Sequence, residues 1–183
     1  EQTIATDQDN GIVFASDDAP RERARLLAFA RDVNDALDTC GYPLCKGNVM
    51  ASNPECCLTQ AEWLARFASW IDHGAPEDLL NASIYFDARP LAGAAALAQP
   101  MRELIGAQAG RNARFMKQMA DNALRNGPAL TWTGAIDTHT QGGRHVVDLK
   151  LHGTAIYVDA ARLFALAQGI AATGTRARFE AAA

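Results

Sequence analysis

Alanine is abundant along the chain, and it constrains the possible folds more than any other single feature. Alanine has the highest helix propensity of the amino acids, whereas strands favour β-branched and aromatic side chains. Aromatic residues make up only 7% of the sequence. Helices are therefore expected to dominate, and a β-sandwich or a β-barrel is disfavoured.

Length and composition indicate a globular protein with one large domain or two small ones. The chain has 183 residues, of which 49% are hydrophobic and 21% are charged. At this size roughly 70% of the unfolded surface can be buried, so folding needs no structural metal or disulfide framework. The four cysteines, at positions 40, 45, 56 and 57, lack the paired spacing of a zinc site. We expect reduced thiols in a cytoplasmic protein.

Charge and hydropathy limit the classes of partner. The net charge is −4, which gives no electrostatic footprint for nonspecific binding to duplex nucleic acid. No apolar run approaches the ~20 residues of a membrane span, and the first residues do not resemble a signal peptide. Neither a membrane nor duplex nucleic acid is therefore an expected partner.

Three short strands are expected in the first half of the chain. Apolar stretches at residues 3–6 and 12–15 flank a polar loop. The Asn10-Gly11 dipeptide is also typical of a tight hairpin turn, so that alternative stays open. A third apolar stretch, at residues 81–89, stops before a proline and is expected to be a strand.

A long helix is expected over residues 19–40. Asp17 or Asp18 can cap its first turn, a proline follows where helices tolerate one, and Gly41 can close its end. Its buried stripe is expected to consist of Leu26, Ala30, Val33 and Leu37.

A second helix is expected near residues 59–72. Thr59 and Glu62 have the spacing of a capping box at its start. Five large apolar side chains then recur at helical spacing, which favours a core position over a ligand platform. They are Trp63, Leu64, Phe67, Trp70 and Ile71.

The sequence changes character after about residue 90. Residues 91–109 and 111–126 are expected to form alanine-rich helices, and residues 155–168 the last clear helix. A polar, glycine-containing connection at 127–143 separates them. The expected fold class is α+β, with a small mixed sheet and flanking helices followed by an all-α helical bundle.

Three acidic residues are candidate ligands of a metal site. If residues 7–9 are extended, Asp7 and Asp9 project from the same face with Cα atoms roughly 6.5–7 Å apart. Paired carboxylates repel one another unless a cation lies between them, and hard oxygen donors suit Mg²⁺. Asp87 could complete the set from a neighbouring strand. The alternatives are a solvated turn at Asp7–Asp9 and an ion pair between Asp87 and Arg89.

Three ordered motifs resemble one known family. They are residues 1–3 with 6–10, residues 41–51 and residues 86–90. Further similarity at 148–150, 153 and 161–163 extends the resemblance along almost the whole chain. The family is that of the nucleotidyltransferases of bacterial signal-transduction proteins, which are commonly fused to CBS and cyclic-nucleotide-binding domains. It is similar to the adenylyltransferase of glutamine synthetase and to the uridylyltransferase of nitrogen signalling.

The resemblance implies a domain organisation and a metal site. It implies a catalytic nucleotidyltransferase-like domain at residues 1–90 and a helical substrate-binding domain at residues 91–183. Asp7 and Asp9 would be the metal pair and Asp87 the third carboxylate, with Mg²⁺ or Mn²⁺ as the cofactor. The family's Gly-Ser phosphate-binding turn does not precede this pair here, and the family continues with further helices, so both domains are expected to be incomplete.

Two cations lie nearest to the acidic motifs in the sequence. Lys46 and Arg89 could contact the oxygens of a nucleoside triphosphate, although solvated surface positions are the alternative. The expected function is transfer of a nucleoside monophosphate from a triphosphate to a hydroxyl of a protein or small molecule. The alternative is a noncatalytic module that senses nucleotide or binds a partner protein. No serine-hydrolase elbow, Walker A motif or dinucleotide fingerprint occurs.

Overall fold

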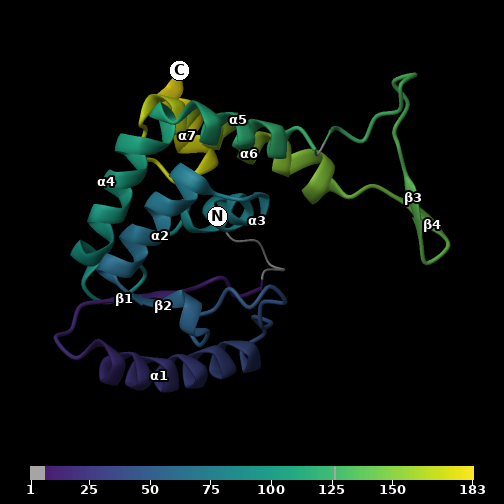
Figure 1. Cartoon of the computed structure of the whole chain (residues 1–183). Helices are drawn as coiled ribbons and strands as arrows, with labels where there is room; N and C mark the ends of the chain where they lie inside the picture. Colours follow the sequence, from purple (N-terminus) through teal and green to yellow (C-terminus); the bar gives the residue numbers. More distant parts are fainter. Residues whose placement is uncertain (1–6, 126) are drawn as a thin grey trace. The chain divides into compact units, whose positions relative to one another are not determined.

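A computed structural model describes residues 7–125 and 127–183. The protein has the expected α+β class, with helices dominating and short strands between them (Figure 1). Contacts divide the chain into two units that do not follow chain order. The first unit takes in the chain up to Ser69 together with Arg89–Glu103, and the second combines Trp70–Ala88 with Leu104–Ala183. The expected strand at residues 3–6 lies outside the described residues.

The first unit contains a two-stranded parallel sheet. Strand β1, Ile12–Phe14, pairs with β2, Cys57–Thr59, in the register that places Val13 opposite Leu58. Parallel neighbours need a long crossover connection, and helix α1, Ala19–Thr39, lies in that connection. The expected strand near 12–15 is confirmed. The alternative of a tight hairpin turn at residues 10–11 is wrong, because neither Asn10 nor Gly11 has the positive φ that such a turn requires.

Helix α1 has the expected ends but a different buried face. The Asp18 side chain accepts a hydrogen bond from the Arg21 backbone, and Gly41 follows the helix at φ +95°, a conformation that favours glycine. Ala30 is buried as expected, but the next buried position is Asn34. Val33 is 37% exposed, so the expected stripe is wrong at that position. Asn34 is buried in place of Val33 because its side chain bonds to the side chains that α1 covers, Gln8 and Asn10.

Helix α2, Gln60–His73, begins with the expected capping box. The Glu62 backbone donates to the Thr59 hydroxyl, and the Glu62 carboxylate accepts from the Thr59 backbone. Trp63 and Phe67 are buried in the first unit and pack edge to face. Trp70 and Ile71, also buried, belong to the second unit, and Leu64 is partly exposed. The core assignment of these side chains is confirmed.

Residues 76–85 form a helix, which corrects the strand expected at 81–89. Helix α3, Pro76–Tyr85, begins with a proline in its first turn, where the missing N–H is not needed. The Ala75 backbone donates to the Asp78 carboxylate. Leu79, Ala82 and Phe86 are buried at helical spacing. The apolar run at 82–86 was therefore one part of a helical face and not a strand.

The alanine-rich part forms short helices. Helix α4, Gln99–Gln108, and α5, Ala113–Ala123, are separated near Gly110 as expected. Residues 91–94 are not helical, and one 3₁₀ turn, η2 at Ala95–Ala98, precedes α4. Another, η3 at Ala109–Arg111, follows α4.

Helix α6, Ala155–Gln168, confirms the last expected helix, and one further helix, α7 at Thr175–Ala182, was not expected. A side chain at Gly110 would collide with the Leu166 carbonyl oxygen, so glycine permits the close approach of η3 to α6. Gly169, at φ +67°, ends α6.

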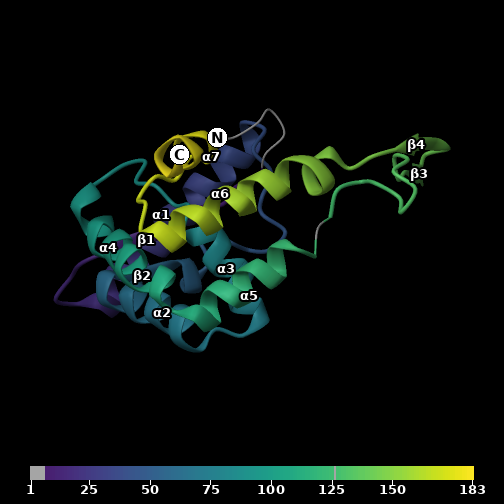
Figure 2. The ribbon, with the colours of Figure 1, turned by 90° about the horizontal axis from the view of Figure 1, so that it is seen from above.

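The connection between α5 and α6 contains a hairpin, so the second half is not all-α. Strands β3, His139–Gln141, and β4, Arg144–Val146, pair antiparallel. Gly142 and Gly143 both have positive φ, as a two-residue hairpin turn requires. Both views show this hairpin well away from α5 and α6 (Figures 1 and 2). In the described part of the chain, every helix is too short or too polar to cross a membrane.

Candidate functional site

The two carboxylates of the Asp7–Asp9 motif are exposed, and the side chains that alternate with them turn inward. Gln8 is only 4% exposed and Asn10 is half-buried. The backbone N–H groups of Gln8 and Asn10 donate to the carbonyl oxygens of Pro43 and Val49, at 3.0 and 3.1 Å. Hydrogen bonds from every second residue are typical of an extended chain, so the two carboxylates project from one face.

A buried pair of amide side chains holds this extended segment. The Gln8 amide donates to the backbone carbonyl oxygens of Asn34 and Tyr42, at 2.9 and 2.8 Å. The Asn34 amide donates in return to the Gln8 side-chain oxygen at 2.7 Å and to the Asn10 side-chain oxygen at 3.2 Å. Sequence reasoning missed Gln8 and Asn34. The available signal was an asparagine within the buried stripe of an amphipathic helix.

The same network fixes the loop that follows α1. The Asn10 side-chain oxygen accepts from the Ala51 backbone at 2.8 Å, and the Asn34 side-chain oxygen accepts from the Ser52 backbone at 3.2 Å. The side chains of Gln8 and Asn34 are therefore satisfied on both oxygen and nitrogen, and the Asn10 side-chain oxygen accepts from two donors. Buried polar groups that are fully paired give one well-defined geometry.

Lys46 lies on this loop, which pairs with the acidic segment through other residues. The loop residues 43 and 49 receive the two backbone hydrogen bonds from the acidic segment, and Lys46 lies between them in the chain. The turn closes with a hydrogen bond from the Asn48 backbone to the Cys45 carbonyl, and Asn48 has a φ of +56°. The described part of the first family-like motif, residues 7–10, thus lies beside the second motif, residues 41–51. Lys46 is exposed, as a group that meets a ligand must be.

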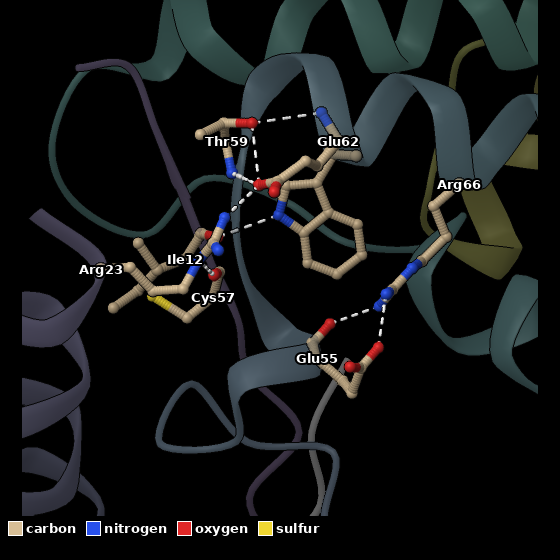
Figure 3. Close-up of polar contacts among 8 residues, drawn as sticks. Ile12, Arg23, Glu55, Cys57, Thr59, Glu62 and Arg66 are labelled. Carbon is tan, nitrogen blue, oxygen red and sulfur yellow. Dashed lines mark hydrogen bonds and ion pairs between the residues drawn. The ribbon is translucent and has the colours of Figure 1, made fainter. Parts of the chain in front are cut away.

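A second polar cluster anchors the strand that continues from the acidic motif (Figure 3). The indole N–H of Trp63 donates to the Ile12 carbonyl at 2.9 Å. Arg23 donates to the Cys57 carbonyl at 3.0 Å and forms an ion pair with Glu62. These contacts tie α1, β1, β2 and α2 together, so the chain leaves the Asp7–Asp9 segment in a fixed direction.

Titration in this cluster follows from its hydrogen bonds and its burial. The Thr59 backbone N–H lowers the pKa of Glu62 below its usual value, with further lowering from Arg23. Burial raises the pKa of the Cys57 thiol, although the positive charge of Arg23 opposes the shift. Glu62 therefore stays ionised and Cys57 stays protonated near neutral pH.

Arg66 fixes the 3₁₀ turn before β2. Both of its terminal nitrogens donate to Glu55, one to the backbone carbonyl and one to the carboxylate, each at 2.5 Å (Figure 3). Glu55 lies in η1, Pro54–Cys56, which leads directly into β2. This bidentate contact holds the approach to the sheet.

Asp87 lies in the second unit, where two buried arginines hold its carboxylate. Arg162 of α6 and Arg178 of α7 donate to its two oxygens, at 2.7 and 2.5 Å. Arg162 also pairs with Asp159, and Arg178 donates to the Ala172 carbonyl. Burial disfavours the charged form of Arg162, but the hydrogen bond and charge of Asp87 outweigh it and raise its pKa.

Asp87 forms ion pairs, as one alternative in the sequence analysis expected, but its partners are Arg162 and Arg178 and not Arg89. Arg89 is exposed and belongs to the first unit. Sequence reasoning missed Arg162 and Arg178. The available sequence signal was an arginine at a helix position whose neighbours on the same face are apolar. Because arginine is almost never fully buried unless it is paired, such a position indicates a buried acidic partner.

The donor set at Asp7 and Asp9 fits a hard divalent cation. Both side chains are exposed carboxylates, the oxygen ligands that Mg²⁺ and Mn²⁺ take. Within residues 7–125 and 127–183, no three His, Cys, Asp or Glu side chains gather closely enough to form a metal cage. Magnesium usually keeps several water ligands and binds one or two carboxylates together with substrate phosphates, so a pair is a sufficient protein contribution. The participation of Asp87 stays a prediction.

Comparison with protein families gives two matches along the chain. Residues 1–77 match the family described as "putative nucleotidyltransferase DUF294". Residues 113–183 match its companion, described as "putative nucleotidyltransferase substrate binding domain". Together the two matches cover most of the chain, in the order that the sequence motifs predict. Searches of curated proteins and of solved structures each found no match.

Proposed function

We propose that this chain, which matches the two DUF294 family models over residues 1–77 and 113–183, transfers a nucleoside monophosphate from a nucleoside triphosphate to a hydroxyl group. The acceptor would be a protein or a small molecule, and the setting bacterial signalling in the cytoplasm. Attached CBS and cyclic-nucleotide-binding domains would be the sensors that regulate it.

The observation that carries this proposal is the exposed pair of Asp7 and Asp9. The buried side chain of Gln8, which lies between them in the chain, anchors their segment to the fold. The buried amide network fixes the backbone from which the pair projects, so this backbone need not reorganise when a ligand arrives. They would hold Mg²⁺ or Mn²⁺, which when bound supplies positive charge to the triphosphate. Lys46, on the adjoining loop, would contact phosphate oxygens as a point charge, and Arg89 as a fork.

The reaction conserves atoms and charge as follows. The acceptor oxygen forms a bond to the α-phosphorus, and the bond from that phosphorus to the oxygen bridging to the β-phosphate breaks. Pyrophosphate leaves with that bridging oxygen. The acceptor hydroxyl loses its proton to a base, for which we propose Asp87. Its Oδ2 accepts a hydrogen bond from Arg162, and the second lone pair of that oxygen is where the proton would go.

A label-transfer assay tests the proposal. The 183-residue chain is incubated with α-labelled triphosphates, Mg²⁺ or Mn²⁺, and bacterial lysate. We expect transfer to fall at least about 100-fold in Asp7→Asn/Asp9→Asn, because the loss of the cation removes several kcal/mol of charge stabilisation. The matched control is Asp38→Asn/Asp121→Asn, which removes two exposed carboxylates elsewhere and should keep full transfer. Equal transfer by all three proteins would exclude the proposed site.

A noncatalytic nucleotide sensor is the second candidate. The observation that favours it is the ion pairing of Asp87 with two buried arginines, an arrangement typical of a structural cluster. Calorimetric titration with a triphosphate separates the two candidates. Binding that needs a divalent cation and is lost in Asp7→Asn/Asp9→Asn supports the enzyme. Equally tight binding without a cation supports the sensor.

A further inference from the structure

Helix α1 carries a continuous exposed face opposite the buried positions 30 and 34. The residues of this face, called the α1 outer face below, recur at spacings of three and four, as one side of a helix requires. They are Arg21, Arg25, Ala28, Phe29, Asp32, Asp35 and Ala36, and all are exposed. Phe29, near the middle, is 59% exposed. Figure 1 shows strands β1 and β2 along the other side of α1.

The charges of the α1 outer face are segregated along the helix. The arginines at 21 and 25 lie in the N-terminal half, and the aspartates at 32 and 35 lie in the C-terminal half. At the start of the helix Glu22 pairs with Arg25, but the two aspartates oppose the helix macrodipole, which favours basic groups at the end. The last turn contains no basic residue. The aspartates at 32 and 35 therefore do not serve the stability of an isolated helix.

When two copies of this helix lie antiparallel, the basic half of each α1 outer face lies opposite the acidic half of the other. In an antiparallel pair of α1 helices centred between Ala28 and Phe29, Arg25 of one copy lies level with Asp32 of the other. Arg21 lies within one residue, about 1.5 Å along the axis, of the level of the other copy's Asp35. The two Phe29 rings meet near the centre. Each contact occurs twice, as a two-fold axis requires.

We propose that the α1 outer face binds a second copy of this chain, forming an antiparallel two-fold dimer. We assign a second copy as the partner because the basic half of this face matches the acidic half of another copy, and the two apolar centres then meet. A single helix of 21 residues gives a contact at the low end of specific interfaces, so the dimer is weak and depends on concentration. Its four cross-pairs are at the rim and in water, so high salt weakens it.

Charge reversal with rescue tests the dimer. Sedimentation equilibrium of the 183-residue chain at about 10–500 µM should show a monomer–dimer equilibrium that weakens in 1 M NaCl. Arg25→Glu places Glu opposite Asp32, and Asp32→Arg places Arg opposite Arg25, so each variant alone should lose at least tenfold in dimer affinity. Mixing the two variants restores both cross-pairs, so the mixture should form heterodimers. The matched control, Arg31→Glu, reverses an exposed charge of α1 outside this face and should dimerise as the wild type does.

The outcomes are separable from those of the proposed enzyme activity, because none of these residues lies at the acidic motif. Heterodimers formed only on mixing establish the antiparallel register. A wild type that stays monomeric throughout the range overturns the proposal. So does a dimer that Arg25→Glu and Arg31→Glu weaken equally, since that would locate the contact elsewhere or make it a general charge effect. Circular dichroism confirms that each variant keeps its helix content.

Discussion

Asn34 is the residue on which the geometry of the acidic segment depends most. It is 2% exposed, and its side chain bonds to Gln8, Asn10 and the Ser52 backbone. Replacing it by alanine removes the partner of the buried Gln8 side-chain oxygen and one hydrogen bond each from Asn10 and the Ser52 backbone, and an unpaired buried group costs about 1–3 kcal/mol. We expect Asn34→Ala to lower the free energy of unfolding by about 2–4 kcal/mol in urea denaturation.

Asp35→Ala is the matched control for that experiment. It changes the next residue of the same helix, but the Asp35 side chain is exposed. A loss below about 0.5 kcal/mol is expected there. If the two variants lost equal stability, the buried network would not be what holds the segment.

Glu62 gives a prediction for pH. Its folded pKa lies below the ordinary value of 4.5, through the Thr59 backbone first and Arg23 second. A lowered acid pKa contributes stability that is present above pH 4.5 and is lost as pH falls through the folded value. The side chain is 44% exposed, so solvent screening keeps its contribution small, under about 1 kcal/mol.

The measurement compares wild type with Glu62→Gln by urea denaturation. The variant should be the less stable protein at pH 7, and the difference should shrink steadily as pH falls below 4.5. A difference that stays constant down to pH 3 would mean that ionisation of Glu62 contributes nothing.

At the residue scale, local chemistry could be predicted and distant partners could not. The Thr59–Glu62 capping box spans three residues, so spacing alone identified it. The Gln8–Asn34 pair joins residues 26 positions apart, and no local pattern specifies that meeting. The pairing of Asp7 with Asp9 could also be predicted from a local spacing, because side chains two residues apart in an extended chain lie on the same face.

Helix α3 shows why one element was predicted wrongly. Its apolar residues at 84–86 resemble a strand when the window is short. Over the longer window, Pro76 at the first turn and buried residues at 79, 82 and 86 follow the helical period. The β3–β4 hairpin was missed for another reason, because its strands are exposed on almost every residue and carry no hydrophobic alternation.

The end of α3 also carries the ion cluster that joins it to α6 and α7. Asp87→Ala would leave Arg178 and Arg162 buried with fewer partners, and both side chains are less than 10% exposed. Removing one partner of a buried ion pair costs about 3–5 kcal/mol, and we expect about 2–4 kcal/mol here because Asp87 is 27% exposed. Thermal or urea unfolding measures it.

Asp121→Ala serves as the control for this cluster. Asp121 pairs with Lys117 on the surface of α5, so its loss should cost under about 0.5 kcal/mol. Equal losses for the two variants would mean that the cluster does not hold the C-terminal helices.

At the scale of the molecule, chain order and contact units differ. Residues 70–88 join the C-terminal helices, and residues 89–103 join the N-terminal sheet and α1. The sequence predicted a change of character near residue 90 from local composition, but which segments gather into one unit depends on contacts between distant residues. The functional domains proposed at 1–90 and 91–183 stay a prediction.

The central claim is that Asp7 and Asp9 bind a divalent cation, and thermal unfolding with Mn²⁺ tests it most directly. A ligand that binds only the folded state at ten times its Kd adds about 1.4 kcal/mol, or about 3–5 °C in Tm at this size. We predict this rise at pH 7.5 for the wild type and for the Asp38→Asn/Asp121→Asn control, and none for Asp7→Asn/Asp9→Asn. Identical responses to Mn²⁺ in all three proteins would contradict the claim.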